Sequence, residues 1–249
     1  MSSSYRSILN SLSSAFSNTK SYFTSDAPIV PIQGANNQLD YLKGENKLTA
    51  SFWFKSNVSS GSGTIPFVSM VSGRTVLFKI AINVNPANTT LQLVIDGSVN
   101  ISTNLATTDW STQWHHLILT YDASSTPSTA TAFINGVNAN VSTVANTTFP
   151  NVTYPTFDIG NTTVGTIFQG YYTQIAFWKT NLTNTEMLSI YNSGCPSDIS
   201  SYNPNTWLKI DNAITDGAGI SFPNSGSEGT SWSSSGALGI HVLPNSPCG

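Results

Sequence analysis

Charged side chains are scarce in this sequence of 249 residues, where Asp, Glu, Lys and Arg together make up only 8%. The net charge is -3, and the Lys and Arg residues form no cluster. Nucleic-acid binding depends on many Lys and Arg contacts to phosphates, and anionic lipid attracts polybasic segments. We therefore expect neither nucleic acid nor a membrane surface as a partner.

Long apolar runs are also missing. No stretch approaches the roughly 20 apolar residues that cross a bilayer. Within residues 1–20, serines, Tyr5 and Arg6 interrupt the apolar run of about 7 to 15 residues that a secretion signal contains. We therefore expect a protein that is made in a cytoplasm without a signal peptide.

Cysteine is nearly absent, and the sequence holds only Cys195 and Cys248. The two residues could close the C-terminal segment as a disulfide in an oxidising environment, or remain free thiols in a cytoplasm. Spacing along the chain does not establish the geometry that a bridge requires. The sequence is compatible with both alternatives.

The first 24 residues carry an amphipathic helical pattern, because apolar side chains recur at three- and four-residue intervals among serines. These residues are Tyr5, Ile8, Leu9, Leu12 and Phe16, called the apolar stripe below. So short a helix is not stable alone, and its stripe must pack on the body of the protein, on a second copy or on another protein. Two prolines in residues 26–34 favour an extended arm after it.

From residue 48 onward, short β-rich runs alternate with Gly, Asn, Pro and Ser, which is typical of a sandwich or jelly roll. We expect strands at residues 48–55, 64–72, 76–83, 90–95, 114–121, 129–134, 156–159 and 170–178. A helix is expected at 184–191, with Thr183 or Asn184 as its cap. Asn135-Gly136 predicts a tight hairpin turn. The predicted fold class is all-β: a two-sheet antiparallel jelly-roll sandwich with a short N-terminal helix and arm.

Three groups of segments carry a family resemblance. They are Leu48-Thr-Ala-Ser-Phe-Trp-Phe-Lys55; Trp114-His-His-Leu-Ile-Leu-Thr-Tyr-Asp122 with Thr131-Ala-Phe-Ile-Asn-Gly-Val137; and Phe157-Asp-Ile-Gly-Asn161 with Ile175-Ala-Phe-Trp178. In this order they resemble the laminin G-like/concanavalin A-like jelly-roll family, in its pentraxin-related branch. The resemblance implies a jelly roll over residues 31–194, preceded by the helix and arm at 1–30. Residues 195–249 are too poor in apolar side chains for a core of their own, so we expect them to pack on the sandwich.

The segment after the jelly roll is similar to a tail found in marine phage and virus structural proteins. Here Trp207-Leu-Lys-Ile210 stands in place of a Trp-Trp-Arg-Met run, and Asn224-Ser-Gly-Ser227 in place of an Asp-Ser-Ser-Gly-Asn-Gly stretch. The resemblance implies a structural protein of the virion surface, in a capsid decoration, neck or fibre. Its expected partners are further copies of itself and other virion proteins such as the capsid shell, contacted through the apolar stripe.

The alternative hypothesis is a glycan-binding, lectin-like module, because the family includes lectin-like members and calcium-dependent pentraxins. Trp110 and Trp232 lie in polar, turn-rich stretches, where an exposed ring could stack on a cell-surface sugar. Calcium prefers clustered carboxylates, whereas the aspartates of the loops are scattered. These are Asp96, Asp109, Asp122 and Asp158. We expect no cofactor, and calcium would be involved only if the protein were such a lectin-like module.

Catalysis is not expected. Glycosidases that share this fold use a Glu-x-Asp-x-x-Glu run to place two carboxyl groups about 5 to 5.5 Å apart. The only glutamates here, Glu45, Glu186 and Glu228, each stand alone, and no Gly-x-Ser-x-Gly elbow is present. His115 and His116 are adjacent, so on a strand they face opposite sides and cannot bind one metal together.

Overall fold

The computed structural model describes residues 21–24, 32–34, 38–56, 63–72, 75–105, 109–155, 157–160, 170–215, 219–235, 242–243 and 247–248. The predicted apolar stripe of Tyr5, Ile8, Leu9, Leu12 and Phe16 lies outside these residues. Among the helices in the described residues, none is long and apolar enough to span a membrane.

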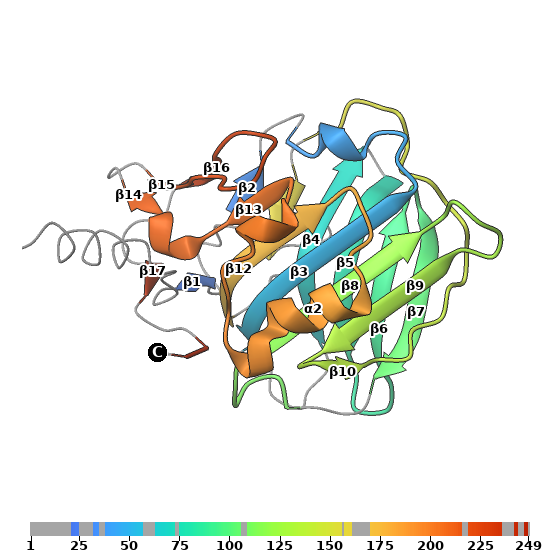
Figure 1. Cartoon of the computed structure of the whole chain (residues 1–249), viewed down its shortest axis with the longest axis horizontal. Helices are drawn as coiled ribbons and strands as arrows, with labels where there is room; N and C mark the ends of the chain where they lie inside the picture. The colour runs from blue at the N-terminus through green and yellow to red at the C-terminus, as the bar shows by residue number, and fades with distance from the viewer. Residues whose placement is uncertain are drawn as a thin grey trace, which may run out of the picture.

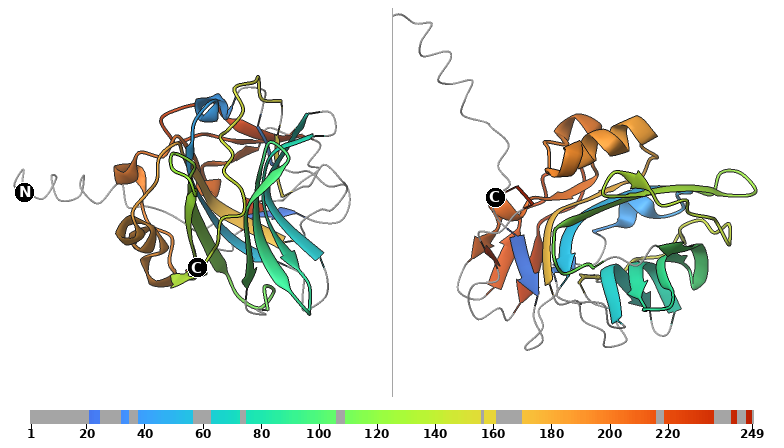
Figure 2. Two further views of the ribbon diagram at one scale, coloured as in Figure 1. Left: turned by 90° about the vertical axis from the view of Figure 1, so that its right-hand side faces the viewer. Right: turned by 90° about the horizontal axis from the view of Figure 1, so that it is seen from below.

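Two antiparallel sheets pack face to face (Figures 1 and 2). Sheet A has the order β10 (Val137–Asn138), β9 (Thr129–Ile134), β8 (His115–Asp122), β3 (Lys47–Ser56), β12 (Gly170–Trp178), β1 (Ser21–Thr24) and β17 (Val242–Leu243), and β13 (Thr206–Leu208) also pairs with β12. Sheet B has the order β14 (Ile214–Thr215), β15 (Gly219–Phe222), β16 (Trp232–Ser235), β2 (Ile32–Gly34), β11 (Phe157–Ile159), β4 (Gly63–Ser72), β5 (Thr75–Val84), β6 (Thr89–Ile95) and β7 (Ser98–Leu105). This architecture confirms the predicted all-β, two-sheet class.

The space between the sheets is filled by aromatic and branched side chains. Phe52 of β3 lies 4.9 Å from Phe67 of β4, measured between ring centroids, and 5.5 Å from Phe177 of β12. Large rings contribute much buried apolar area, so they dominate the stability of such a core. Trp53, between Phe52 and Phe54 on β3, faces the other side of sheet A and stacks on His116.

The outer face of sheet A is covered by the helix α2 (Asn184–Tyr191) and the residues that follow it. Met187 and Ile190 of α2 pack with Ile118, Trp178 and other side chains in a second apolar cluster. Because both of its faces are covered, β8 is buried from His115 to Tyr121, as the apolar run in its sequence predicted. Short 3-10 turns lie at Asp40–Leu42, Asn192–Gly194, Ser200–Tyr202 and Ile210–Asn212.

The predicted strands and helix are present, with boundaries that differ by a residue or two, and the predicted helix coincides with α2. The helical pattern assigned to residues 1–24 is wrong at its end, where Ser21–Thr24 form the strand β1. Tyr, Phe and Thr favour a strand, and β12 and β17 provide hydrogen-bond partners on both sides. Strand β7 was not predicted.

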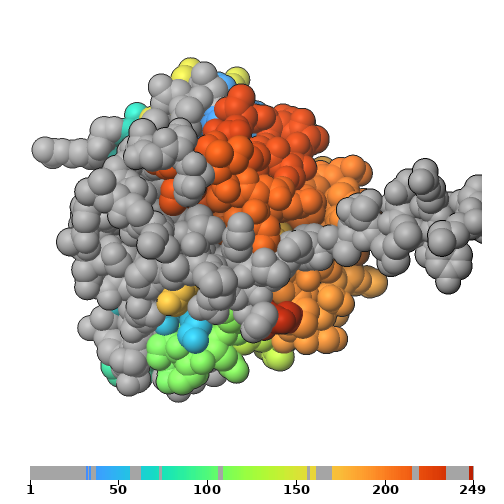
Figure 3. Space-filling model, turned by 90° about the vertical axis from the view of Figure 1, so that its left-hand side faces the viewer, coloured from blue at the N-terminus to red at the C-terminus, as the bar shows by residue number. Residues whose placement is uncertain are grey.

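The described strands after residue 195 join both sheets. Strand β13 pairs with β12, β14 to β16 join sheet B through β2, and β17 pairs with β1. On the side shown in Figure 3, residues of this extension lie directly against the segment that contains α2. Cys195, directly after the turn at Asn192–Gly194, forms a disulfide with Cys248 near the end of the chain.

Candidate functional site

A pocket of about 380 Å³ opens where edge strand β10 of sheet A and edge strand β7 of sheet B come together. In Figure 1, β7 lies on the right and β10 at the bottom, whereas β1 and β17 lie on the left. The lining residues are Asn104, Leu105, Trp110, Ile134, Asn135, Val137, Asn138, Ala139 and Asn140. We call this the asparagine pocket, because four of its lining residues are asparagines.

The β9–β10 hairpin forms one wall of the pocket, and its turn is fixed by local sequence. Asn135 and Gly136 both have positive φ, +51° and +74°, as the Asn-Gly pattern predicted. A Cβ on Gly136 would lie 2.6 Å from the Tyr191 ring, so only glycine lets α2 approach this turn. The Asn135 side chain accepts a hydrogen bond from the His116 backbone N–H at 2.9 Å.

His115 and His116 brace this wall from opposite faces of β8. The Nδ2 group of Asn135 donates to His115 Nδ1 at 2.9 Å, and burial lowers the pKa of His115. The His115 ring packs 4.9 Å from the indole of Trp110, while His116 stacks on Trp53 at 4.7 Å on the other side. The Asn135 side chain therefore uses both its oxygen and its amide nitrogen in hydrogen bonds within the protein, and the wall is held before any ligand arrives.

The other three asparagine side chains keep free hydrogen-bonding groups. Asn138 Oδ1 accepts from the Asn140 backbone N–H at 2.7 Å, which leaves its Nδ2 group open. The side-chain amides of Asn104 and Asn140 have no hydrogen-bond partner among the residues that the structure describes. All three residues are exposed. Unpaired amides that line one pocket can bind hydroxyl, carbonyl and N–H groups.

Trp110 and Trp232 are not exposed, so the prediction that their rings stack on sugar from the surface is wrong. Trp110 is 1% exposed and packs on Phe54 and His115, while Trp232 is 0% exposed and stacks on Phe177. Burying a large aromatic ring stabilises the fold, so such a ring can be buried even where its neighbours in sequence are polar. Trp110 nevertheless contributes to the pocket wall, and its Nε1 has no partner within the described residues.

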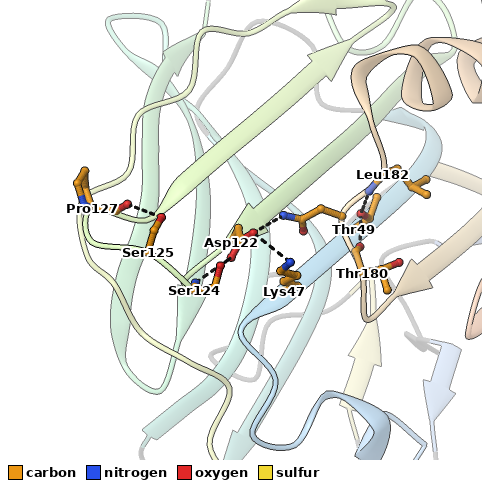
Figure 4. A network of polar contacts seen from close by, with 9 residues as sticks. Lys47, Thr49, Asp122, Ser124, Ser125, Pro127, Thr180 and Leu182 are labelled. Carbon is orange, nitrogen blue, oxygen red and sulfur yellow. Dashed lines mark hydrogen bonds and ion pairs between the residues drawn. The ribbon is translucent and has the colours of Figure 1, made fainter.

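The aspartates that the sequence placed in loops accept hydrogen bonds from neighbouring residues where the structure describes their contacts. Figure 4 shows Asp122 between donors: Ser124 at its Oδ1, and Lys47 and Asn181 at its Oδ2, 3.6 and 3.1 Å away. Asp109 likewise accepts from the Ser111 backbone and hydroxyl. No group of three or more His, Cys, Asp or Glu side chains that could hold a metal occurs in the described part of the chain. Asp96 and Asp158 complete no such group.

Two of the glutamates stabilise structure. Glu186 closes a capping box with Thr183 at the start of α2. Glu228 accepts hydrogen bonds from Lys179 and Asn205, each at 3.0 Å. Neither lines the asparagine pocket, and none of the nine residues that do carries a carboxyl group.

Comparisons with known proteins agree with this fold. The family model described as the concanavalin A-like lectin/glucanases superfamily matches residues 32–187. A candidate carbohydrate binding protein from Bacteroides ovatus is similar in structure, with a TM-score of 0.61 and 14% identity over 92% of this chain and 60% of that one. A heptameric SAP-like pentraxin from Limulus polyphemus has a TM-score of 0.51 and 16% identity over 71% of this chain and 83% of that one. No curated protein matches the sequence.

Proposed function

Because the chain belongs to the concanavalin A-like lectin/glucanase superfamily, we propose that it is a non-catalytic recognition domain that binds a neutral glycan in the asparagine pocket. The observation that carries the proposal is the set of free amides on Asn104, Asn138 and Asn140. Sites for small molecules combine an apolar wall with a few fixed polar groups, and the pocket volume is in the usual range for them.

The proposal has a second part, which concerns how the domain is displayed. Strands β1 and β17 lie at one end of sheet A and β10 lies at the other, so β1 lies across the sheet from the pocket. A domain attached through the apolar stripe of residues 1–24 would therefore present the pocket away from its support. Together with the low charge and the virion-like tail, this arrangement favours a structural protein on the surface of a virus particle.

A glycan array tests the first part. We expect the wild-type protein to bind neutral glycans, and the double variant Asn104→Ala, Asn138→Ala to lose at least about tenfold in affinity because its free amides are gone. Asn151→Ala is the matched control, since Asn151 is exposed and does not line the pocket. Binding that is unchanged in the double variant, or absent from the wild type, would contradict the proposal.

Light scattering on the full chain tests the second part. We expect the wild type to form a homo-oligomer, and the double variant Ile8→Ser, Leu12→Ser to be a folded monomer because its stripe is no longer apolar. Thr19→Ser is the control outside the stripe. Equal masses for the wild type and the stripe variant would rule out this mode of assembly.

A further inference from the structure

We propose that the asparagine pocket recognises a sugar residue that carries an acetamido group, that is, an N-acetylated hexosamine within an uncharged glycan. The inference rests on the proposed function and specifies which class of sugar fits. It follows from the juxtaposition of apolar side chains and free amides in one pocket.

Apolar and amide side chains alternate along the β10 side of the pocket. Val137 is followed by Asn138, Ala139 and Asn140, and all four line the pocket. Val137 is 70% exposed, which is high for a valine that faces a pocket. A ligand with a methyl group would cover this side chain, and the area removed from water would add to the affinity.

The amides have a polarity that suits the N–H and C=O groups of an acetamido substituent. Asn138 Oδ1 accepts from the Asn140 backbone, and the free Nδ2 group of the same side chain can donate to a carbonyl oxygen. Asn104 and Asn140 keep free Oδ1 atoms, which match an amide N–H. An acetamido group combines a methyl, an acceptor and a donor within one small planar unit, whereas a hydroxyl offers no methyl.

Charged sugars do not fit the same walls. None of the nine lining residues is ionisable, so neither a carboxylate or sulfate nor the ammonium group of a free amino sugar would find a counterion. A charged group would therefore gain no ion pair from the lining, whereas an acetamido group would gain the contacts of its methyl, N–H and C=O groups. The pocket therefore selects the acetylated form over the free amine.

The test is a titration of the full chain with the methyl glycosides of N-acetylglucosamine, N-acetylgalactosamine, glucose and glucosamine, followed by NMR shifts. We expect at least one N-acetylated sugar to bind at least about fivefold more tightly than glucose or glucosamine. Val137→Thr keeps the shape of the side chain but replaces a methyl group with a hydroxyl, so it should reduce this preference to less than about twofold. Val144→Thr is the matched control, because Val144 is 64% exposed and does not line the pocket.

The outcomes separate this inference from the proposed function. Binding of glucose as tightly as the acetylated sugars, or a preference that survives Val137→Thr, would overturn the inference and leave glycan binding intact. If no neutral glycan binds in either the titration or the array, the proposed function fails together with it.

Discussion

His116 shows how one buried side chain makes the stability of this fold depend on pH. Its ring is fully buried and stacks on both Trp53 and Tyr191, and Ser51, at Nε2, is its hydrogen-bond partner among the described residues. Nδ1 has no partner in the described structure, so a protonated ring would bury an unpaired N–H group. Desolvation lowers the pKa of His116 to about 3.

The low pKa of His116 predicts loss of stability in mild acid. The unfolded chain titrates near the ordinary histidine pKa of about 6.5. Below that pH the unfolded state binds more protons than the folded one, so the free energy of unfolding falls as the pH drops from about 6.5 toward 3, by up to about 1.4 kcal/mol per pH unit. Urea unfolding between pH 7 and 4 measures this slope.

His116→Gln provides the comparison, since it removes the titrating ring and leaves His115 in place. The free energy of unfolding of the variant should change less with pH between pH 6 and 4 than that of the wild type. Parallel slopes for the two proteins would show that His116 does not control acid stability.

At the pocket, the sequence was informative about the turn and misleading about the aromatic rings. Asn135-Gly136 fixed the expected hairpin through its backbone preference alone, which is a local property. Trp110 is buried by Phe54 and His115, which are distant in sequence or on another strand. Its polar neighbours in sequence therefore led to the wrong prediction that the ring is exposed. The repeated asparagines after the hairpin were the available signal for the site.

The helix α2 illustrates which elements a sequence can predict. Its cap is local: the Glu186 backbone N–H donates to the Thr183 side chain, and the Thr183 N–H donates back to Glu186 Oε2 at 2.7 Å. The strands β13 to β17 were missed because each has only two to four residues, and β13, β16 and β17 also take partners from remote segments. Strand β7 was missed because its inward face includes Asn100, which is buried and accepts from the Tyr121 hydroxyl.

For α2, we predict that the packing of its buried side chains contributes more to the free energy of unfolding than its N-terminal cap does. Thr183→Ala should lower the free energy of unfolding by about 1 kcal/mol through loss of the capping bond. Met187→Ala should lower it by about 2–5 kcal/mol, because Met187 is buried against sheet A. Urea unfolding gives both values, and the exposed Ser189→Ala change, expected within about 0.5 kcal/mol, is the control. A larger loss for Thr183→Ala than for Met187→Ala would refute this order.

At the scale of the whole molecule, the disulfide closes a loop with a sequence separation of 53 that contains β13 to β17. A cross-link across a loop of this length restricts the unfolded chain and typically stabilises the native state by about 2–4 kcal/mol. We therefore predict that Cys248→Ser lowers the free energy of unfolding by that amount.

Thermal unfolding with and without reductant checks the prediction. The wild type should lose stability on reduction, and Cys248→Ser should be insensitive to the reductant. A wild-type Tm that is the same in both conditions would show that the bridge does not contribute.

Strand β1 is hydrogen-bonded on both sides, to β12 and to β17, and β17 lies within the loop that the disulfide closes. If the residues before Ser21 tether the domain, a mechanical load would enter sheet A at β1 and be shared by two ladders. The covalent bridge between Cys195 and Cys248 would limit how far β17 can peel away under that load. The fold would thus resist drag at its point of attachment while the asparagine pocket, at the opposite edge of the sheet, stays undistorted.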